Sequence, residues 1–352
     1  MIQKLHLQAF RNLKTKFLEF SPDTTVIVGK NAAGKTNILE SIYLLSTGKS
    51  FKARVESEMV NYDAEIAQIK GLVEEDKLEV VLTRGQINLG TSNPERVARK
   101  RLLVNGVGKR LIDFSGILKV VLFAPQDLDL ITESPNLRRR FLDSILTQID
   151  REYYRSLLSY EKGLRQRNKL LLRIREERLP TNSLTFWDNL LIKNGNYLSN
   201  KRAELIVFID NSPDFNGENF SITYDQSIIS ESRLASYARE EVAAGTTLVG
   251  PHRDDFCLFL QKNGSPRALD RFGSRGEQRM GVLWLKLAEL GFIENKSGEK
   301  PVLLLDDIFS ELDKAHRSVV TKLTQSQQTI ITTTENPPDK ISARVSLINL
   351  VK

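Results

Sequence analysis

The segment Gly29–Thr36, GKNAAGKT, carries the sharpest chemical signal in the sequence. It fits the pattern GxxxxGK[ST], follows the apolar run Thr25–Val28 and opens a predicted helix over about Lys35–Leu45. In this setting, backbone N–H groups of a glycine-rich loop and a helix N-terminus surround phosphates. We therefore predict a phosphate-binding loop, in which Lys35 neutralises the β- and γ-phosphates and the Thr36 hydroxyl binds Mg²⁺. The residues expected to contact the nucleotide here are Gly29, Lys30, Asn31, Ala32, Ala33, Gly34, Lys35, Thr36 and Asn37.

Two carboxylates follow a second apolar run, Val302–Leu305, and complete the predicted site. A phosphate-binding loop needs an acidic partner at the end of another buried strand. We expect Asp306 to hold Mg²⁺ through water and Asp307 to orient the attacking water. Two aspartates after a strand can instead cap a helix, but the phosphate loop in the same chain favours the metal interpretation.

A third element, Ser274-Arg275-Gly276-Glu277-Gln278, opens a predicted helix that runs to Leu290. It resembles the LSGGQ-type signature of ABC ATPases, in which the serine and backbone N–H groups grip the γ-phosphate of a nucleotide held by the partner subunit. A helix N-terminus suits an anion, although a serine there is normally only an N-cap. The resemblance implies that Ser274 and Gly276 contact ATP across a dimer interface.

Two shorter segments fit the same scheme. Gln126, after the apolar run Leu118–Phe123, resembles the Q-loop glutamine that reaches Mg²⁺ and water in ABC ATPases. Ser310–Asp313, just past the aspartate pair, resembles their D-loop. Each is weak evidence alone, because a single glutamine or an acidic loop is usually polar surface.

The elements that must position these residues alternate between strands and helices, which indicates an α/β core. Apolar runs predict strands at Thr25–Val28, Leu118–Phe123, Val302–Leu305 and Thr329–Thr332, with a helix near 314–324 between the last two. Asn105-Gly106 predicts a tight hairpin. Helical spacing predicts long helices over Leu137–Glu177 and Leu184–Phe208, with short strands at Phe220–Tyr224 and Phe256–Leu260. We predict an ATPase lobe formed by residues 1–127 and 296–352 and a mainly helical second lobe over 128–295.

Composition excludes several classes of protein. The 352 residues include 40% hydrophobic and 27% charged side chains, which is typical of a globular chain rather than a disordered one. No run of about 18 apolar residues predicts a membrane span, and no secretory signal is visible at the N-terminus. A single cysteine, Cys257, excludes a disulfide framework, and three scattered histidines disfavour a histidine-built metal site. We expect a cytoplasmic protein.

The net charge of +7 is unevenly distributed. Residues 84–110 and residues 138–180 each carry a net charge of +6, which leaves −5 for the rest of the chain. Two basic regions on a slightly acidic body suggest a polyanionic partner, although a basic run alone is usually a solvated face. The candidate DNA contacts in these two regions are Arg99, Arg101, Lys109, Arg110, Arg138 and Arg140.

The ordered set of motifs resembles the RecF family over nearly the whole chain. The segments that carry the resemblance are AFRNL (Ala9–Leu13), GKNAAGKTN (Gly29–Asn37), TGKSF (Thr47–Phe51), PNLRRRFLD (Pro135–Asp143), GPHRDD (Gly250–Asp255), GSRGEQR (Gly273–Arg279) and LLDDIFSELD (Leu304–Asp313). GPHRDD and the last segment are more specific than the phosphate loop, because generic transporters lack them. Departures include Glu133, where the family pattern implies glycine, and Gln126, where it often has glutamate.

The resemblance implies an ABC-type P-loop ATPase head with a mixed sheet, related to SMC-like proteins but without a long coiled coil. It implies slow, DNA-stimulated ATP hydrolysis with Mg²⁺, ATP-dependent homodimerisation on single- or double-stranded DNA, and cooperation with RecR and RecO in loading RecA at gaps. Arg11 and Asn12 would approach the nucleotide from the N-terminal strand turn. Thr332 would occupy the place of the switch histidine of many ABC ATPases.

Several alternatives remain open at this point. An energy-coupling ABC ATPase subunit, another SMC-like ATPase, or a DNA-structural protein that uses ATP only for folding would share the phosphate loop. An ATPase with a nuclease domain is disfavoured, since no further acidic cluster follows Asp307 at a strand end. For GPHRDD, a salt-bridged structural loop competes with direct contact to nucleotide or DNA.

Overall fold

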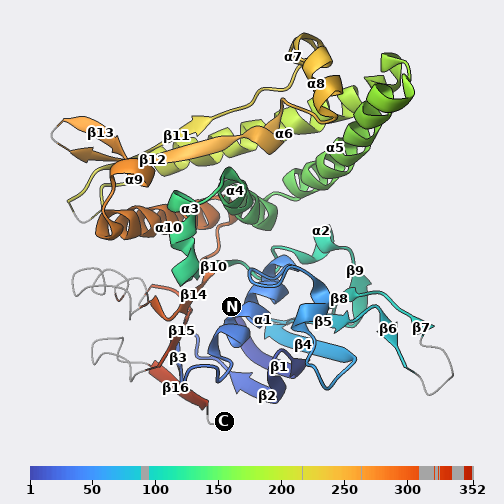
Figure 1. Cartoon of the computed structure of the whole chain (residues 1–352). Coiled ribbons are helices and arrows are strands. Elements are labelled where there is room, and N and C mark those ends of the chain that lie inside the picture. The colour runs from blue at the N-terminus through green and yellow to red at the C-terminus, as the bar shows by residue number, and fades with distance from the viewer. Residues whose placement is uncertain are drawn as a thin grey trace. The chain divides into compact units, whose positions relative to one another are not determined.

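The computed structural model describes residues 1–88, 95–215, 217–262, 264–308, 321, 324, 326–334 and 345–350. The chain folds into two compact units, Met1–Pro125 with Ile293–Lys352, and Gln126–Phe292 (Figure 1). The described part of the first unit contains two large sheets and the two-stranded sheet β6-β7, and the second unit contains long helices with a small sheet. Among the described helices, none is both long and apolar enough to cross a membrane.

The first sheet of unit 1 is antiparallel and has six strands in the order β2-β1-β4-β5-β8-β9. These strands are β1 (Ile2–Phe10), β2 (Leu13–Glu19), β4 (Ile66–Val73), β5 (Asp76–Thr83), β8 (Lys100–Val104) and β9 (Val107–Lys109). The β8–β9 hairpin confirms the turn predicted at Asn105-Gly106. Both residues have positive φ, 52° and 80°, as a two-residue hairpin turn requires.

The second sheet of unit 1 is parallel and has the strand order β10-β14-β15-β3-β16. Its strands are β3 (Thr24–Gly29), β10 (Val120–Phe123), β14 (Val302–Asp306), β15 (Thr329–Thr333) and β16 (Val345–Leu350). The runs VVLF and VLLLD are buried at every position, as expected for parallel strands covered on both faces. The four strands predicted in this sheet are confirmed.

Helix α1 (Lys35–Thr47) contacts strands of both sheets and joins them into one core. Its buried side chains Ile38, Leu39 and Ile42 belong to the same cluster as Ile69 of β4 and Leu122 of β10. The smaller elements of unit 1 are η1 (Glu56–Met59), β6 (Gln86–Ile87), β7 (Glu95–Arg96) and α2 (Leu111–Phe114). The predicted helix near 314–324 lies almost wholly outside the described residues.

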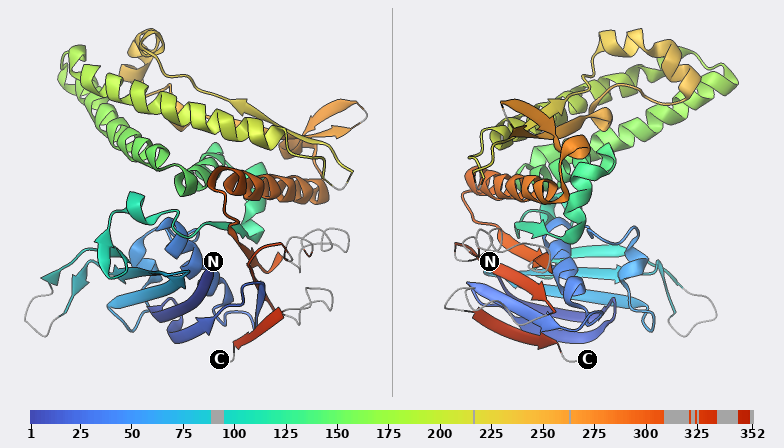
Figure 2. Two further views of the ribbon diagram at one scale, coloured as in Figure 1. Left: turned by 180° about the vertical axis from the view of Figure 1, so that it is seen from behind. Right: turned by 60° about the vertical axis from the view of Figure 1, so that its left-hand side comes forward.

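Unit 2 is built on an antiparallel pair of long helices, α5 (Arg151–Glu177) and α6 (Thr185–Asp210), seen side by side in Figure 2. The sheet has three antiparallel strands in the order β11-β12-β13. The remaining elements are η2 (Pro125–Leu128), α3 (Asp129–Thr132), α4 (Pro135–Ile149), η3 (Thr181–Leu184), β11 (Phe220–Asp225), α7 (Glu231–Ser236), α8 (Ala238–Ala244), η4 (Pro251–Arg253), β12 (Asp255–Lys262), β13 (Ser265–Ala268), α9 (Leu269–Phe272) and α10 (Arg275–Ser297).

The single helix predicted over Leu137–Glu177 is wrong, because the chain breaks at Asp150. This residue has extended angles, φ −126° and ψ 103°, and its side chain accepts a hydrogen bond from the N–H of Tyr153 at 2.8 Å. Asp150 therefore ends α4 and caps α5. The apolar spacing continues through the break, so periodicity alone did not reveal it.

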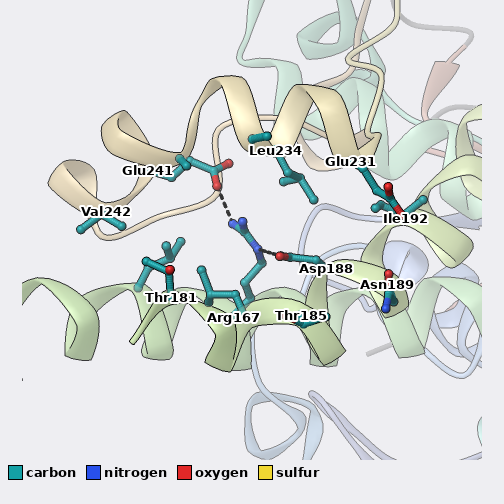
Figure 3. A pocket seen from close by; sticks show the side chains of 14 residues that line it. Arg167, Thr181, Thr185, Asp188, Asn189, Ile192, Glu231, Leu234, Glu241 and Val242 are labelled. Carbon is teal, nitrogen blue, oxygen red and sulfur yellow. Dashed lines mark hydrogen bonds and ion pairs between the residues drawn. The ribbon is translucent and has the colours of Figure 1, made fainter. Parts of the chain in front are cut away.

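Arg167 fastens α8 to the α5–α6 pair (Figure 3). Its guanidinium, 2% exposed, lies 2.6 Å from Asp188 Oδ1 and 2.7 Å from Glu241 Oε2, and donates to Thr247 Oγ1 at 2.9 Å. The cavity beside it has a volume of about 280 Å³. Pockets for small ligands start at about 300 Å³, and the charged groups Arg167, Asp188 and Glu241 pair with one another. We interpret this region as a structural contact that holds α8 against α5 and α6.

Candidate nucleotide-binding site

The phosphate loop lies between β3 and α1, and its shape depends on one glycine. Gly34 has φ 100°, and a Cβ atom there would lie 2.7 Å from Leu13 Cδ2 and 3.0 Å from Asn12 Oδ1. Any other residue would clash with the β1–β2 turn. The first turn of α1 contains no acidic residue, so its free N–H groups and the positive end of the helix dipole remain suited to an anion.

The Lys35 ammonium lies along the loop itself. Nζ donates to the carbonyl of Gly29 at 2.7 Å and to that of Lys30 at 3.1 Å, and the side chain is buried. An ammonium has three donors, so one N–H is not used by these two bonds. The lysine is therefore fixed at the loop by backbone acceptors, with donor capacity left for a phosphate oxygen.

Thr36, Asp306 and Thr332 converge from three different elements at the carboxyl edge of the parallel sheet. The Thr36 hydroxyl donates to Asp306 Oδ1 at 2.9 Å, and the Thr332 hydroxyl donates to the same oxygen at 2.8 Å. Asp306 and Thr332 are buried. Hydroxyl and carboxylate oxygens are the protein ligands that Mg²⁺ prefers, so this oxygen set fits the predicted metal, directly or through water.

Asp307 follows in a left-handed backbone conformation, with φ 52°. Its N–H donates to the Thr332 carbonyl at 3.2 Å and to the Thr332 hydroxyl at 3.1 Å. Thr332 thus contacts both aspartates while being buried itself. In the structure it is a positioning residue for the pair rather than a group open to nucleotide. Ser310–Asp313, the predicted D-loop, lie outside the described residues.

Arg11 is paired within unit 1, and its approach to the nucleotide stays a prediction. Its guanidinium forms a two-bond pair with Glu40, at 2.8 and 2.6 Å, and donates to the Glu58 carbonyl at 2.8 Å. Glu40 is fully buried in α1, so this pair fixes the β1–β2 turn against the helix. Glu40 belongs to no local sequence motif, so the sequence alone did not predict this pair.

Asn12 and Asn37 brace the phosphate loop from outside. The Asn12 amide donates to the Ala32 carbonyl at 2.9 Å, and the Asn37 amide donates to Asn12 Oδ1 at 2.8 Å. Ala32 has φ 64°, a conformation that costs energy for a residue with a Cβ. The two asparagines therefore hold the loop in a shape that it would not prefer alone.

The signature segment of unit 2 forms a capping box at the start of α10. The N–H of Glu277 donates to Ser274 Oγ at 3.3 Å, and the N–H of Ser274 donates to Glu277 Oε2 at 2.7 Å. The adjacent Lys262 ammonium and the Ser274 N–H lower the pKa of Glu277 to about 2. The N-cap interpretation of Ser274 is thus confirmed. Ser274 and Gly276 are exposed, and a Cβ at Gly276 would meet no atom within 4 Å.

The remaining candidates lie mostly at the surface. Gln126 is exposed in η2. Arg99, Arg101 and Lys109 are exposed on or beside the β8–β9 hairpin. Arg110 is exposed too and pairs with Asp113 at 2.8 Å.

Arg138 belongs to the fold of unit 2. Its guanidinium pairs with both oxygens of Asp255, at 2.6 and 2.9 Å, and with the Glu133 carbonyl at 2.8 Å. We therefore do not carry it forward as a DNA contact, whereas Arg140 is exposed. Glu133 has φ −103°, so its position does not require the glycine that the family pattern implies.

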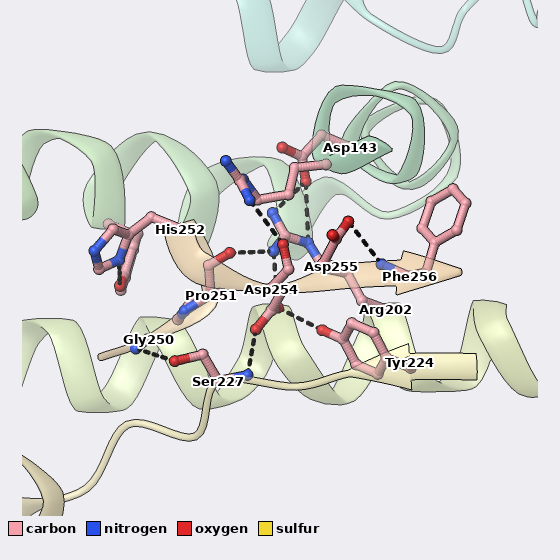
Figure 4. Close-up of polar contacts among 12 residues, drawn as sticks. Asp143, Arg202, Tyr224, Ser227, Gly250, Pro251, His252, Asp254, Asp255 and Phe256 are labelled. Carbon is pink, nitrogen blue, oxygen red and sulfur yellow. Dashed lines mark hydrogen bonds and ion pairs between the residues drawn. The ribbon is translucent and has the colours of Figure 1, made fainter. Parts of the chain in front are cut away.

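The GPHRDD segment forms a buried polar network (Figure 4). Asp254 accepts bonds from Arg202 at 2.9 Å, from the Ser227 N–H at 2.8 Å and from the Tyr224 hydroxyl. Arg202 also pairs with Asp143 at 2.8 Å. The structure therefore favours the salt-bridged loop over direct contact with nucleotide or DNA.

His252 of the same segment lies between Tyr160 and the Thr247 carbonyl, with ring-nitrogen distances of 2.8 and 3.0 Å. Burial lowers its pKa to about 4, so the ring is neutral near pH 7. Gly250, just before it, has φ 120°, and a Cβ there would lie 2.4 Å from the Tyr160 hydroxyl. Both features belong to the packing of the loop.

Comparisons with known proteins agree with this geometry. Residues 1–348 match the family described as the RecF/RecN/SMC N-terminal domain. A DNA replication and repair protein RecF from Lachnoclostridium phytofermentans is 35% identical over 345 residues, covering 95% of this chain and 92% of the relative. Another, from Herpetosiphon aurantiacus, is 36% identical over 364 residues, covering 95% and 93%.

Solved structures extend the likeness to the fold. A structure of the recombination mediator protein RecF with ATP has a TM-score of 0.85, is 33% identical and covers 96% of this chain and 93% of its own. An Smc head domain derived from Pyrococcus furiosus has a TM-score of 0.51 at 17% identity, covering 95% and 90%. The second likeness concerns the fold alone, and together they identify a mixed α/β ATPase head of the RecF and SMC type.

Proposed function

The chain belongs to the RecF family of DNA replication and repair proteins, and on that premise we propose that it is an ATP-dependent DNA-binding recombination mediator. The convergence of Lys35, Thr36 and Asp306 at one edge of the parallel sheet carries this proposal. Membership of the family also removes the alternative of an energy-coupling transporter subunit.

We propose that Mg²⁺–ATP binds at the phosphate loop of unit 1. The N–H groups at the start of α1 and the Lys35 ammonium would hold the phosphates, while Thr36 and Asp306 would hold the metal. Bound Mg²⁺ neutralises charge that develops on the phosphate oxygens during transfer. The Gly34 cradle and the shared Asp306 oxygen support this assignment, because both features lie where the ligands would be needed.

We propose slow hydrolysis in which Asp307 orients the attacking water. Thr332 fixes the backbone of Asp307 through two acceptors, which would keep the carboxylate in one place as the phosphate charge changes. Gln126 is the second candidate for holding water and metal. The side chain of Asp307 is shorter than the glutamate found at this position in transporters, which suits slow rather than rapid ATP hydrolysis.

We further propose that two copies sandwich two ATP molecules, as twofold symmetry requires. The exposed α10 N-terminus, with Ser274 and Gly276, would contact the nucleotide held by the other copy. DNA would bind through backbone phosphates, with Arg99, Arg101, Lys109, Arg110 and Arg140 as candidate contacts. RecR, RecO and RecA are the partners that the family suggests.

Light scattering with and without Mg²⁺–ATP tests the central step. We expect the wild-type protein to shift from monomer to dimer with ATP, and Lys35→Ala to remain a monomer because the phosphate loop loses its cation. Lys14→Ala, which removes an exposed lysine of β2 in the same unit, is the matched control and should behave as wild type. A dimer that forms equally without nucleotide, or in Lys35→Ala, would contradict ATP-dependent dimerisation.

A further inference from the structure

The two long helices of unit 2 expose surface stripes of similar spacing and different charge. The exposed positions opposite the buried face of α5 recur every three or four residues, and they are Arg151, Arg155, Leu158, Lys162, Arg165, Lys169, Leu172 and Glu176, with Arg173 beside Leu172. Five further residues are exposed along the flanks of this stripe, namely Glu152, Glu161, Gln166, Arg175 and Glu177. The corresponding positions of α6 are Phe186, Asn189, Lys193, Asn196, Asn200, Glu204 and Val207. Over all its exposed residues, α5 carries seven cations and four acids, whereas α6 carries one cation and two acids.

Solubility alone does not explain this difference. An exposed helix face needs polar residues, and the asparagines of α6 meet that need without net charge. Mixed charges at helical spacing would also serve, and they would stabilise the helix through ion pairs. On α5, Arg155 pairs with Glu152 and Arg173 with Glu177. The central Lys162, Arg165 and Lys169 have no acidic partner among the described residues.

The stripe lies opposite the buried face of α5, which includes Tyr153, Tyr160, Leu171 and Ile174. The central cations Lys162, Arg165 and Lys169 therefore lie on the face of α5 that points away from its core. From Arg151 to Arg173 the stripe extends for about 33 Å, at 1.5 Å per residue. This length is close to one turn of duplex DNA, about 34 Å.

We propose that the α5 stripe binds the phosphate backbone of duplex DNA along the length of α5. This inference rests on the proposed DNA binding and adds its location within unit 2. Contacts from flexible, exposed cations to phosphates are independent of sequence and sensitive to salt. Within the basic region at 138–180, the stripe faces solvent, as do Arg140, Arg175 and Arg178, whereas Arg138 and Arg167 are committed to the fold.

The test compares two triple variants of equal charge in the full-length protein. One carries Lys162→Gln, Arg165→Gln and Lys169→Gln. The control carries Lys193→Gln, Arg239→Gln and Arg267→Gln, which removes three exposed cations of unit 2 that lie outside α5. Glutamine has nearly the helix propensity of lysine and arginine, and Arg267 is an exposed residue of β13, so both variants should fold. The probe is a fluorescent duplex of about three helical turns, titrated with Mg²⁺–ATP present at several salt concentrations.

We expect the stripe variant to bind the duplex about tenfold or more weakly, with a salt slope reduced by about 2.7, or 0.9 for each lost phosphate contact. The control should keep the slope of the wild type. Equal affinities and slopes for the two variants would overturn the stripe while leaving the proposed function intact. A wild-type protein without DNA binding would overturn both.

Two further probes separate other occupants of the stripe. Loss of binding to a single strand of the same sequence but not to the duplex would overturn the duplex assignment. Loss of binding to poly-L-glutamate with unchanged DNA binding would identify an acidic protein as the partner and overturn the DNA assignment. Light scattering with ATP should show dimers for both variants, because α5 contains none of the proposed nucleotide contacts.

Discussion

Asp306 in unit 1 and Asp254 in unit 2 are both buried carboxylates beside a strand, but their partners differ in charge. Asp306 accepts from two neutral hydroxyls, those of Thr36 and Thr332, and no cation pairs with it among the residues that the structure describes. Asp254 is matched by the Arg202 guanidinium, a tyrosine hydroxyl and a backbone N–H. A buried charge without a paired cation is costly. The difference therefore separates a carboxylate suited to a cationic ligand from one that holds the fold.

The largest expected effect comes from removing Arg202, the cation that pairs with Asp254 and Asp143. Arg202→Met would leave the buried Asp254 and the half-buried Asp143 without their cation, and we expect the free energy of unfolding to fall by about 3–5 kcal/mol. Urea denaturation of the full-length protein, followed by circular dichroism, measures this loss of stability. Arg140→Met, at an exposed arginine of α4, is the control and should change stability by less than about 0.5 kcal/mol. A loss below about 1 kcal/mol for Arg202→Met would contradict the structural role of the network.

The pH dependence of the same cluster should come next in size. The folded pKa of His252, about 4, lies below the ordinary value near 6.5, so protonation favours the unfolded chain. Its contribution is fully present above pH 6.5 and is lost as pH falls toward 4, by about 3 kcal/mol at most.

Urea midpoints measured between pH 7 and pH 4 test this dependence against His252→Gln. That variant should be less stable at pH 7 but should lack the part of the slope that His252 contributes. Identical slopes in the two proteins would show that the ring is not held in its neutral form.

Asp306→Asn should show the opposite behaviour to Arg202→Met. It removes a carboxylate that has no cationic partner among the described residues, so stability without ligand should stay the same or rise. The stabilisation by Mg²⁺–ATP, about 2.7 kcal/mol at a hundredfold excess over Kd, should be lost. Thermal unfolding with and without Mg²⁺–ATP measures both quantities.

Asp307→Asn provides the matched comparison for that experiment. It should keep the Mg²⁺–ATP stabilisation while turnover falls at least tenfold, because the proposed role of Asp307 concerns water rather than metal. Normal stabilisation by Mg²⁺–ATP in Asp306→Asn would remove Asp306 from the metal site.

The sequence predicted the strands, the helix and the turn around the motifs of unit 1 well, because these elements depend on short, local patterns. The phosphate loop, the strand before Asp306 and the Asn105-Gly106 turn each depend on neighbours within a few positions. The Arg11–Glu40 pair and the Arg202–Asp254 network join residues 29 and 52 positions apart, and no local pattern encodes such pairings. The helix break at Asp150 was missed because the apolar period continues across it.

The smallest expected effect divides two roles of one residue in the signature segment. Ser274 caps α10 through the N–H of Glu277, so Ser274→Ala should cost about 1 kcal/mol of stability. If Ser274 also grips the nucleotide of a second copy, the variant should bind ATP normally but fail to dimerise. Glu277→Ala removes the other half of the capping box without touching the serine hydroxyl, so it should lose similar stability and still dimerise. Light scattering with ATP distinguishes the two variants. Equal dimerisation by both would show that Ser274 only caps α10, a purely structural role like that of Asp254 in unit 2.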